Sequence, residues 1–380
     1  MRIFHNLNVD FLGKRRFFYL LSLVLFLIGI INIASRGLVF GIDFKGGAEI
    51  VLQFEKQINI AQIRANVENI GLGNVEVRTF GGETGVLIRT EMQDIPADVY
   101  PKVVNNIEED IKNIIPGVNF NEVERTNNSI TYSFPNPDTT NLVIDQLGSL
   151  GFQTSKVSEE LNNKQMNVRV AISDWIKINL KDKFKDNPFT VLKEDKVGPK
   201  VGEELKRDAV IAVLLSLVVI LIYLGFRFKL VFAVAAVVAL FHDVLITLGL
   251  YAALYGVIPG LNLDIDLTIV AAFLTLVGYS INDTVIVFDR VRENLKIHKT
   301  QSLYEIMNKS INQTMSRTII TSFTTLLAVF VLLLFGGDVL RAFAFTLLFG
   351  IVIGTYSSIF VASAFVLDYA ERSKKKVQFS

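Results

Sequence analysis

The sequence predicts an α-helical polytopic membrane protein with six transmembrane helices and a large extracytoplasmic α+β domain between helices 1 and 2. Three observations predict this fold class: six apolar runs of membrane-spanning length, basic residues gathered in alternate loops, and a long polar region after the first run. With 380 residues, 51% hydrophobic and 20% charged, the chain is too apolar for a purely soluble protein and too charged for a purely membrane-embedded one.

Each apolar run is close to the roughly 20 residues that a helix needs to cross hydrocarbon. The first run, at 17–36, follows a cytoplasmic N-terminus at 1–16. It exceeds the ~7–15 apolar residues of a signal peptide and no A-x-A cleavage pattern follows it, so we expect a retained anchor. The segment 208–371 holds the other five runs, at about 208–226, 230–254, 267–288, 318–335 and 342–367.

Lysine and arginine in short loops set the orientation of such a bundle. The loops opposite to the basic ones carry Asp264, Asp266 and Asp338. Both termini are therefore expected in the cytoplasm, with the loop 289–316 and the tail 372–380. Apolar residues at helical spacing in 289–316 indicate either a helix along the membrane surface or a connecting helix packed on the bundle ends. The basic loops hold Lys14, Arg15, Arg16, Arg227, Lys229, Arg290, Arg292, Lys296, Lys299, Lys309, Arg317, Arg372, Lys374, Lys375 and Lys376, and Arg341 is the one basic residue in the opposite loops.

The polar region 37–207 is long enough for a domain of its own, which this topology places outside the cytoplasm. Helical patterns alternate there with short β-like runs, which favours α+β layers. The breaker-rich stretch 133–138 divides the region, and each half fits a strand, a helix, two strands and a helix. Two ferredoxin-like modules, at about 50–130 and 131–195, are therefore one interpretation. The helical patterns cover 60–70, 100–115 and 139–150, and the β-like runs cover 50–54, 75–78, 86–89 and 166–170.

Composition excludes several kinds of function. The formal net charge of +1 excludes a strongly basic nucleic-acid-binding protein. The absence of cysteine excludes disulfides, thiolate metal sites and cysteine nucleophiles. Only three histidines occur, His5, His242 and His298, which leaves little material for a metal centre. We therefore expect no cofactor, no metal and no nucleic-acid partner.

Asp283 is a carboxylate inside an otherwise apolar segment, 278–290. A charge at the centre of a membrane helix costs at least about 2.5–3.5 kcal/mol on insertion scales, so it is rarely kept for packing alone. The basic edge at Arg290 places Asp283 roughly 9–10 Å inside the segment, at about 1.5 Å per residue. Desolvation favours the neutral acid, which predicts a proton acceptor. The alternative is a structural carboxylate hydrogen-bonded to hydroxyls such as Ser280 or Thr284.

Arg317 opens the fifth run and is expected to reach the depth of Asp283. A guanidinium there would hold the carboxylate ionised until a proton arrives or the helices shift. The alternative is an anchor that extends to the headgroups. The hydroxyls that follow, among them Thr321, offer partners on a proton path, although such residues also simply pack helices together.

Other polar residues of the apolar runs are weaker candidates. Asp243 with His242 predicts either a second proton site, since histidine titrates near neutrality, or a polar contact between helices. Asn282 is a further supporting polar residue beside the Asp283 position. Asp289 and Arg290 predict an orienting pair at the membrane interface.

Glycines mark two close approaches. Asp43, Gly46 and Gly47 form a turn motif after the first run, in which glycine permits positive φ and the aspartate caps the turn. A phosphate-binding loop is disfavoured, because the motif lacks the Walker pattern and lies on the wrong side of the membrane for ATP. Gly350 and Gly354 form a G-x-x-x-G pattern that lets a neighbouring helix approach.

Three segments together resemble the SecF proteins of the SecD/SecF family: 41–47, 197–205 and 278–294. The six runs, the large loop after the first and the Arg317-Thr318 opening of the fifth are similar too. The resemblance implies a non-enzymatic subunit of the bacterial cytoplasmic (inner) membrane that binds SecD, often with YajC, beside the SecYEG channel. It implies use of the proton motive force to draw unfolded preprotein out on the extracytoplasmic side.

The same resemblance matches the family's essential carboxylate to Asp283 and its arginine to Arg317, and it assigns a further carboxylate to the partner subunit. The outer domain looks larger than the family's usual single module. Three alternatives stay open: an exporter of the resistance-nodulation-division type, an intramembrane aspartyl protease using Asp243 and Asp283 without the usual G-x-G-D pattern, and a purely structural subunit. A lone carboxylate also serves protons or sodium ions alike.

Overall fold

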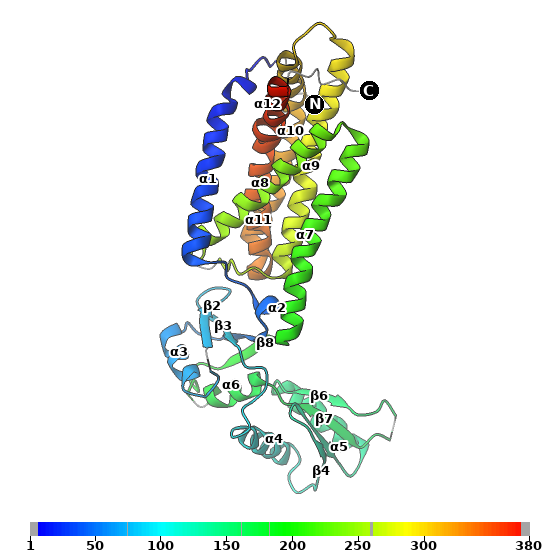
Figure 1. Ribbon diagram of the computed structural model, residues 1–380. Helices are drawn as coiled ribbons and strands as arrows, with labels where there is room; N and C mark the ends of the chain where they lie inside the picture. The colour runs from blue at the N-terminus through cyan, green and yellow to red at the C-terminus, as the bar shows by residue number, and fades with distance from the viewer. Residues whose placement is uncertain (1–6, 74, 161, 182, 259–260, 374–380) are drawn as a thin grey trace. The chain divides into compact units, whose positions relative to one another are not determined.

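The computed structural model describes residues 7–73, 75–160, 162–181, 183–258 and 261–373 (Figure 1). The chain forms two compact units, which we call the membrane unit (Met1–Gly41 and Glu204–Ser380) and the α+β unit (Ile42–Glu203). These bounds lie close to the expected domain at 37–207, and the second boundary falls inside helix α7. Parts of the expected cytoplasmic ends, with His5 and Lys374 to Lys376, lie outside the described residues.

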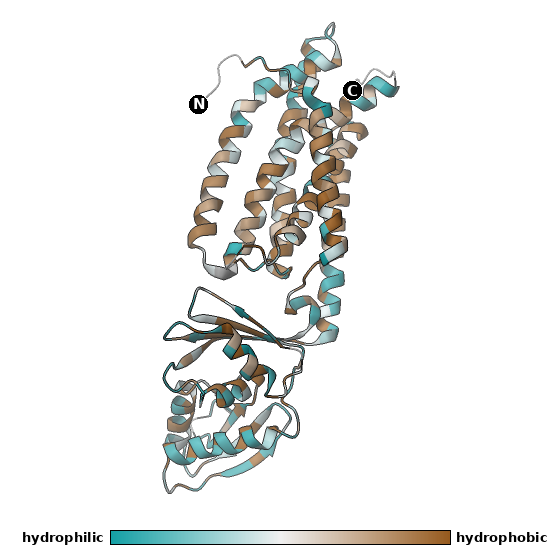
Figure 2. Cartoon of the chain, turned by 90° about the vertical axis from the view of Figure 1, so that its left-hand side faces the viewer, coloured by the Kyte–Doolittle hydropathy of each residue, from teal (hydrophilic) through white to brown (hydrophobic). Residues whose placement is uncertain are grey.

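Six helices in the described part of the membrane unit are long and apolar enough to cross a membrane, which confirms the predicted fold class. Figure 2 shows the apolar surface along them. They are α1 (Arg15–Arg36), which follows the 3-10 turn η1 (Leu12–Lys14), then α7 (Pro199–Arg227), α8 (Leu230–Leu254), α9 (Leu267–Ile297), α10 (Leu303–Phe335), and the continuous helix of α11 (Gly337–Ser357), the π-helix η2 (Ser358–Ala362) and α12 (Ser363–Ser373).

The segment 289–316 belongs to the helix bundle. Helix α9 continues to Ile297, and α10 begins at Leu303 with a capping box, in which Ser302 Oγ accepts from the Glu305 amide at 3.2 Å. Met307 and Ile311 are fully buried in the bundle core. The connecting helix packed on the bundle is therefore the right interpretation, and a helix lying along the membrane surface is wrong.

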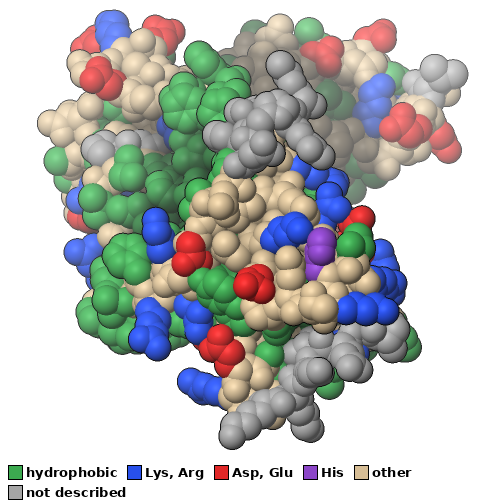
Figure 3. Space-filling model, turned by 90° about the horizontal axis from the view of Figure 1, so that it is seen from above, with side chains coloured by type: hydrophobic (Ala, Val, Ile, Leu, Met, Phe, Trp, Pro, Cys, Tyr) green, Lys and Arg blue, Asp and Glu red, His purple; other side chains and the backbone are tan. Residues whose placement is uncertain are grey.

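The α11–α12 helix is the most enclosed of the six, and α1 and α7 are the most exposed. Helix α11 packs on α8, α9 and α10, and α1 packs on α8. At the α1–α8 contact a Cβ added to Gly249 would lie 2.5 Å from the Cα of Gly29, so only glycine lets these backbones meet. Arg15 of α1 forms ion pairs with Asp368 and Glu371 of α12 at 2.9 Å each. Figure 3, seen from above, shows basic and acidic side chains close together on that face of the molecule.

The α+β unit contains two four-stranded antiparallel sheets. The first has the order β2-β3-β1-β8 and the second β4-β5-β7-β6. The strands are β1 (Gly47–Phe54), β2 (Val75–Thr79), β3 (Gly85–Thr90), β4 (Asn121–Arg125), β5 (Ser129–Ser133), β6 (Gln153–Lys156), β7 (Gln165–Arg169) and β8 (Phe189–Val197), and the helices are α2 (Ile42–Lys45), α3 (Ile60–Glu68), α4 (Tyr100–Ile114), α5 (Pro137–Ser149) and α6 (Ile172–Lys181).

This strand order differs from two consecutive modules at 50–130 and 131–195. Strand β8 returns to pair with β1, with Ile50 opposite Glu194, so the second sheet is an insertion between β3 and β8. The breaker-rich stretch 133–138 starts a helix: the Asn136 side chain caps α5 by accepting from the Thr139 amide at 2.8 Å, and Pro137 follows in the first turn. The breakers therefore mark a helix N-terminus and no module boundary.

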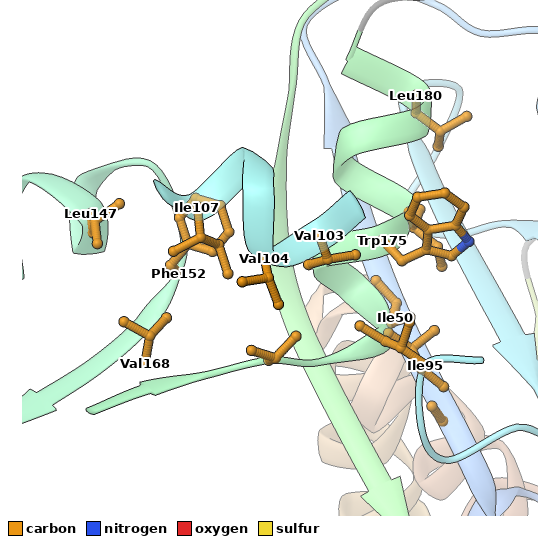
Figure 4. Packing of buried hydrophobic residues seen from close by; sticks show 14 of the residues in the cluster. Ile50, Ile95, Val103, Val104, Ile107, Leu147, Phe152, Val168, Trp175 and Leu180 are labelled. Carbon is orange, nitrogen blue, oxygen red and sulfur yellow. The ribbon is translucent and has the colours of Figure 1, made fainter. Parts of the chain in front are cut away.

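One hydrophobic core joins the two sheets of the α+β unit. Helix α4 buries Val103, Val104 and Ile107, which point between Ile50 of the first sheet and Val168 of the second in Figure 4. Burying each such side chain contributes about 1.5–3 kcal/mol, so α4 links the sheets into one folding unit.

The glycine turn packs backbone against backbone inside the α+β unit. Gly46 has φ of 76°, and a Cβ added there would lie 2.8 Å from the Cα of Pro199. Gly47 has φ of 121°, and its Cβ would lie 2.3 Å from the Thr90 carbonyl oxygen. The segments 41–47 and 197–205 therefore meet in space. Asp43 lies in the first turn of α2, before the turn that the glycines form.

We predict that Gly47→Ala destabilises the α+β unit more than Gly82→Ala. Gly82 has nearly the same φ, 120°, but nothing lies within 4 Å of an added Cβ, so it isolates backbone strain from the steric clash. The extra cost at Gly47 should be about 1–3 kcal/mol, as for other overpacked sites. Hydrogen exchange of the β1 amides measures it, and equal exchange in both variants would contradict the close approach.

Candidate functional site

Asp283 is buried in the membrane unit, with 1% of its surface exposed. Its Oδ2 accepts a hydrogen bond from Ser322 Oγ of α10 at 3.3 Å, and its Oδ1 has no partner among the described residues. Ser322 Oγ also lies 2.9 Å from Thr355 Oγ1 of α11. Because an unpartnered oxygen of a buried carboxylate is costly, this geometry suits the neutral acid better than the ionised one.

Arg317 does not pair with Asp283 in this structure. Its side chain is exposed, and it forms no ion pair among the residues that the structure describes. Ser322, about one and a half turns further along α10, occupies the position beside Asp283. The pairing of Arg317 with Asp283 stays a prediction about another arrangement of these helices.

Asp243 on α8 is equally buried and is far better supplied with hydrogen-bond donors. Its Oδ1 lies 2.9 Å from His242 Nδ1. Its Oδ2 accepts from Ser280 Oγ of α9 at 2.6 Å and from Ser357 Oγ of α11 at 2.8 Å. Three donors around one carboxylate stabilise its ionised form. The two carboxylates are thus held by different partners, which does not fit the shared-proton pair of an aspartyl protease.

The hydrogen bonds continue from His242 across the bundle. His242 Nε2 lies 3.0 Å from the Tyr356 hydroxyl of α11, and that hydroxyl lies 3.0 Å from Ser22 Oγ of α1. No periodic pattern in the sequence indicates this contact. The consecutive polar residues 356–358 inside the apolar 342–367 were the one available sign.

Small residues bring α11 close enough to α9 for these contacts. A Cβ added to Gly354 would lie 2.9 Å from the Cβ of Ser280, and one added to Gly350 would lie 2.5 Å from Leu276 Cδ1. This confirms the close approach predicted from the G-x-x-x-G pattern. The π-helix η2 starts directly after Ser357, and such widened turns occur frequently at functional sites.

Two predicted supporting residues serve other partners. Ser280 donates to Asp243, whereas the structural alternative had it bonded to Asp283. Thr284 is buried beside Asp283, but its hydroxyl donates to the Ser280 carbonyl at 3.4 Å. Ser280 therefore connects α9 to the Asp243 site, and Ser322 is the hydroxyl that contacts Asp283.

Three more predicted residues lie away from Asp283. Thr321 donates within its own helix, to the Arg317 carbonyl at 3.0 Å. Asp289 is exposed and forms an ion pair with Arg227 of α7 at 3.2 Å. It therefore does not pair with Arg290, which contacts Glu293 at 2.5 Å instead.

Asn282 is exposed, because one residue along a helix turns the side chain by about 100° from the Asp283 direction. It belongs to a stripe on α9, the α9 stripe, formed by Ala271, Thr275, Gly278 and Asn282, all exposed. Nothing lies within 4 Å of a Cβ added to Gly278. Small and polar residues here are therefore not required by the packing of this chain itself.

Among the described residues, no group of three or more histidines and acidic side chains lies close enough to hold a metal ion. The site is made of carboxylates, hydroxyls and one imidazole. Proton exchange and hydrogen bonding are the chemistry that such groups provide.

Fold and site together define a multi-pass membrane protein with carboxylates buried between its helices and an α+β unit inserted after the first helix. The family "Protein export membrane protein SecD/SecF, C-terminal" matches residues 177–372, and the SecD/SecF GG motif matches residues 31–58. The protein translocase subunit SecF of Rhodothermus marinus is 40% identical, over 98% of this chain and 97% of its own. That of Koribacter versatilis is 38% identical, over 98% and 94%.

The chain belongs to the SecF family of protein translocase subunits, and it is thus a membrane component of the Sec protein-export pathway. The crystal structure of SecDF from Thermus thermophilus is similar as well, with a TM-score of 0.65 and 31% identity over 97% of this chain. This chain spans 39% of the SecDF chain, so it corresponds to part of that protein.

Proposed function

We propose that this chain is the subunit that couples the proton motive force to preprotein translocation and release, in complex with SecD. The observation that carries the proposal is Asp283, a fully buried carboxylate with one weak hydrogen bond and one unpartnered oxygen. Such a group changes its surroundings strongly when it gains or loses a proton, because the charged form needs a partner that the present arrangement does not supply.

Arg317 is the partner that the ionised form needs. It opens the transmembrane part of α10, the same helix that carries Ser322 to Asp283. Loss of the Asp283 proton would favour a movement of α10 that brings the guanidinium toward the carboxylate, and protonation would release it. A proton crossing 100 mV yields about 2.3 kcal/mol, which biases a conformational equilibrium without unfolding a domain.

The orientation follows from charge. Basic residues gather in the connections α7–α8 and α9–α10, which places these connections and both termini in the cytoplasm and the α+β unit outside it. The family resemblance implies the bacterial cytoplasmic (inner) membrane as the compartment. The family resemblance implies the SecYEG channel, YajC and an unfolded preprotein as further partners. We propose no catalytic role for this chain.

The SecD complex has its own structural support. The α9 stripe is exposed, and it consists of small and polar side chains of the kind that line helix–helix interfaces in membranes. The similar SecDF chain contains more than twice the length matched here, so a neighbouring half is present in that protein. A transmembrane helix of SecD is the partner that we assign to the stripe.

We predict that Asp283→Asn abolishes gradient-dependent translocation and leaves the gradient-independent part unchanged. The amide keeps the shape of the side chain but cannot be ionised. Release of a preprotein from vesicles that contain the channel, SecD and either form of this chain measures the effect, with and without an imposed proton gradient.

Thr314→Ala serves as the matched control, since the hydroxyl of this buried α10 residue donates within its own helix, to the Ser310 carbonyl at 3.0 Å. Equal gradient responses of Asp283→Asn and wild type would show that Asp283 is structural. Replacing the proton gradient by a sodium gradient in the same vesicles distinguishes the two coupling ions.

We also predict that Gly278→Leu weakens co-purification with SecD without unfolding this chain, because a bulky side chain fills the space where the partner helix approaches. Gly225→Leu on α7 is the matched control, since nothing lies within 4 Å of an added Cβ there either. Equal recovery of SecD with both variants would remove the α9 stripe as its binding surface.

A further inference from the structure

We propose that His242 and Asp243 form a second proton-binding site of the bundle, filled and emptied through the hydrogen-bonded chain His242–Tyr356–Ser22. The existence of this site is inferred from the hydrogen-bond geometry, and its role in coupling rests on the proposed function. It concerns α8, α11 and α1, whereas Asp283 contacts α10.

The carboxylate of Asp243 lies within hydrogen-bond distance of an imidazole and two hydroxyls. Its two oxygens receive His242 Nδ1 at 2.9 Å, Ser280 Oγ at 2.6 Å and Ser357 Oγ at 2.8 Å. A contact that only joined helices would need no ionisable pair, because hydroxyls alone provide such bonds. Two ionisable groups side by side, Asp243 fully buried and His242 half-buried, point to a proton that is exchanged.

The chain beyond His242 can carry that proton without moving a heavy atom. When the imidazole is neutral, Nδ1–H donates to Asp243 and Nε2 accepts from the Tyr356 hydroxyl, which in turn accepts from Ser22. When a proton arrives at Ser22, Ser22 passes its own hydrogen to Tyr356, and Tyr356 passes its hydrogen to His242 Nε2. Afterwards Nε2–H donates to the Tyr356 hydroxyl, and that hydroxyl donates to Ser22 Oγ. Each hydroxyl passes on its own hydrogen and takes one from its other neighbour, so atoms and charge balance.

Few other charged or titratable side chains face the His242–Asp243 pair. The titratable side chains that face the site are His242 on α8 itself and Tyr356 on α11. From α9 the contact is the hydroxyl of Ser280, with Asp283 one turn further along that helix, and from α1 it is the hydroxyl of Ser22. No lysine or arginine forms an ion pair with Asp243 among the described residues.

Asp243 joins three helices, so its protonation would affect how they pack. Ser280 and Ser357 donate to the same oxygen of Asp243, so the carboxylate holds α8, α9 and α11 together. Ser357 Oγ also lies 3.1 Å from the Gly354 carbonyl, which offers that hydroxyl a second acceptor. A proton placed on Asp243 itself would turn Ser357 to Gly354 and loosen this junction next to the π-helix.

Nitrogen NMR of the full-length chain in lipid nanodiscs tests the proposal. The sequence holds only three histidines, so histidine labelled with ¹⁵N gives few signals, and His242→Gln assigns the relevant one. We expect His242 to change from imidazolium to neutral imidazole across a pH titration. In Asp243→Asn, which removes the ionisable partner of His242 Nδ1, we expect the pH response of the His242 signal to differ from that of the wild type.

Tyr356→Phe tests the chain with less disturbance to folding, because it removes one hydroxyl. We expect Tyr356→Phe to slow proton exchange at His242. We expect no change in the control Tyr251→Phe, because the buried Tyr251 hydroxyl bonds to Thr346 and is not part of the His242–Tyr356–Ser22 relay. Equal exchange in the two tyrosine variants overturns the relay. A His242 signal that stays neutral at every pH overturns the site.

These outcomes separate the inference from the proposed function, since the NMR titration needs neither SecD nor preprotein. If His242 titrates while Asp283→Asn translocates normally under a gradient, the site stands and the coupling proposal fails. If His242 stays neutral while Asp283→Asn loses the gradient response, the second site fails and the coupling proposal stands.

Discussion

The rest of the membrane unit depends on one constraint: a carboxylate inside hydrocarbon must lose its charge or be given partners. This chain contains both solutions. Asp283 has a single long hydrogen bond and an unpartnered oxygen, while Asp243 has three donors around it. Asp243 of α8 bonds to Ser280, which lies about one turn before Asp283 on α9, so two carboxylates with very different hydrogen-bond partners lie in the same part of the bundle.

Helix packing follows from this constraint. Polar bonds as short as those at Asp243 require backbones to approach closely, and the glycines of α11 permit it against Leu276 and Ser280. Small and polar side chains also form the α9 stripe, which is exposed in the part of the chain that the structure describes. Inside the chain, Gly350 and Gly354 pack against Leu276 and Ser280. At Gly278 on the stripe, no described residue lies within 4 Å of an added Cβ, which is why we assign a partner helix to the stripe.

Sequence patterns predicted the six membrane helices well, because apolar runs of that length have few other structures open to them. They also predicted the close approach at Gly350 and Gly354, because the G-x-x-x-G spacing is a local pattern. They did not predict that β8 returns to β1, since strand pairing across more than a hundred residues leaves no local mark. Nor did they predict that Ser280 serves Asp243 while Asn282 faces outward, because hydrogen-bond partners depend on how helices are rotated against each other.

The central claim is that the protonation state of Asp283 sets the arrangement of α9 and α10. Because the chain has no native cysteine, spin labels on Thr275→Cys and Thr324→Cys would be the only labels present. Pulsed electron resonance then measures the distance distribution between these two exposed positions in nanodiscs at low and high pH. The account predicts a distribution that changes with pH in the wild-type background and stays in its low-pH form in Asp283→Asn. The same pH-dependent change in both backgrounds would contradict it.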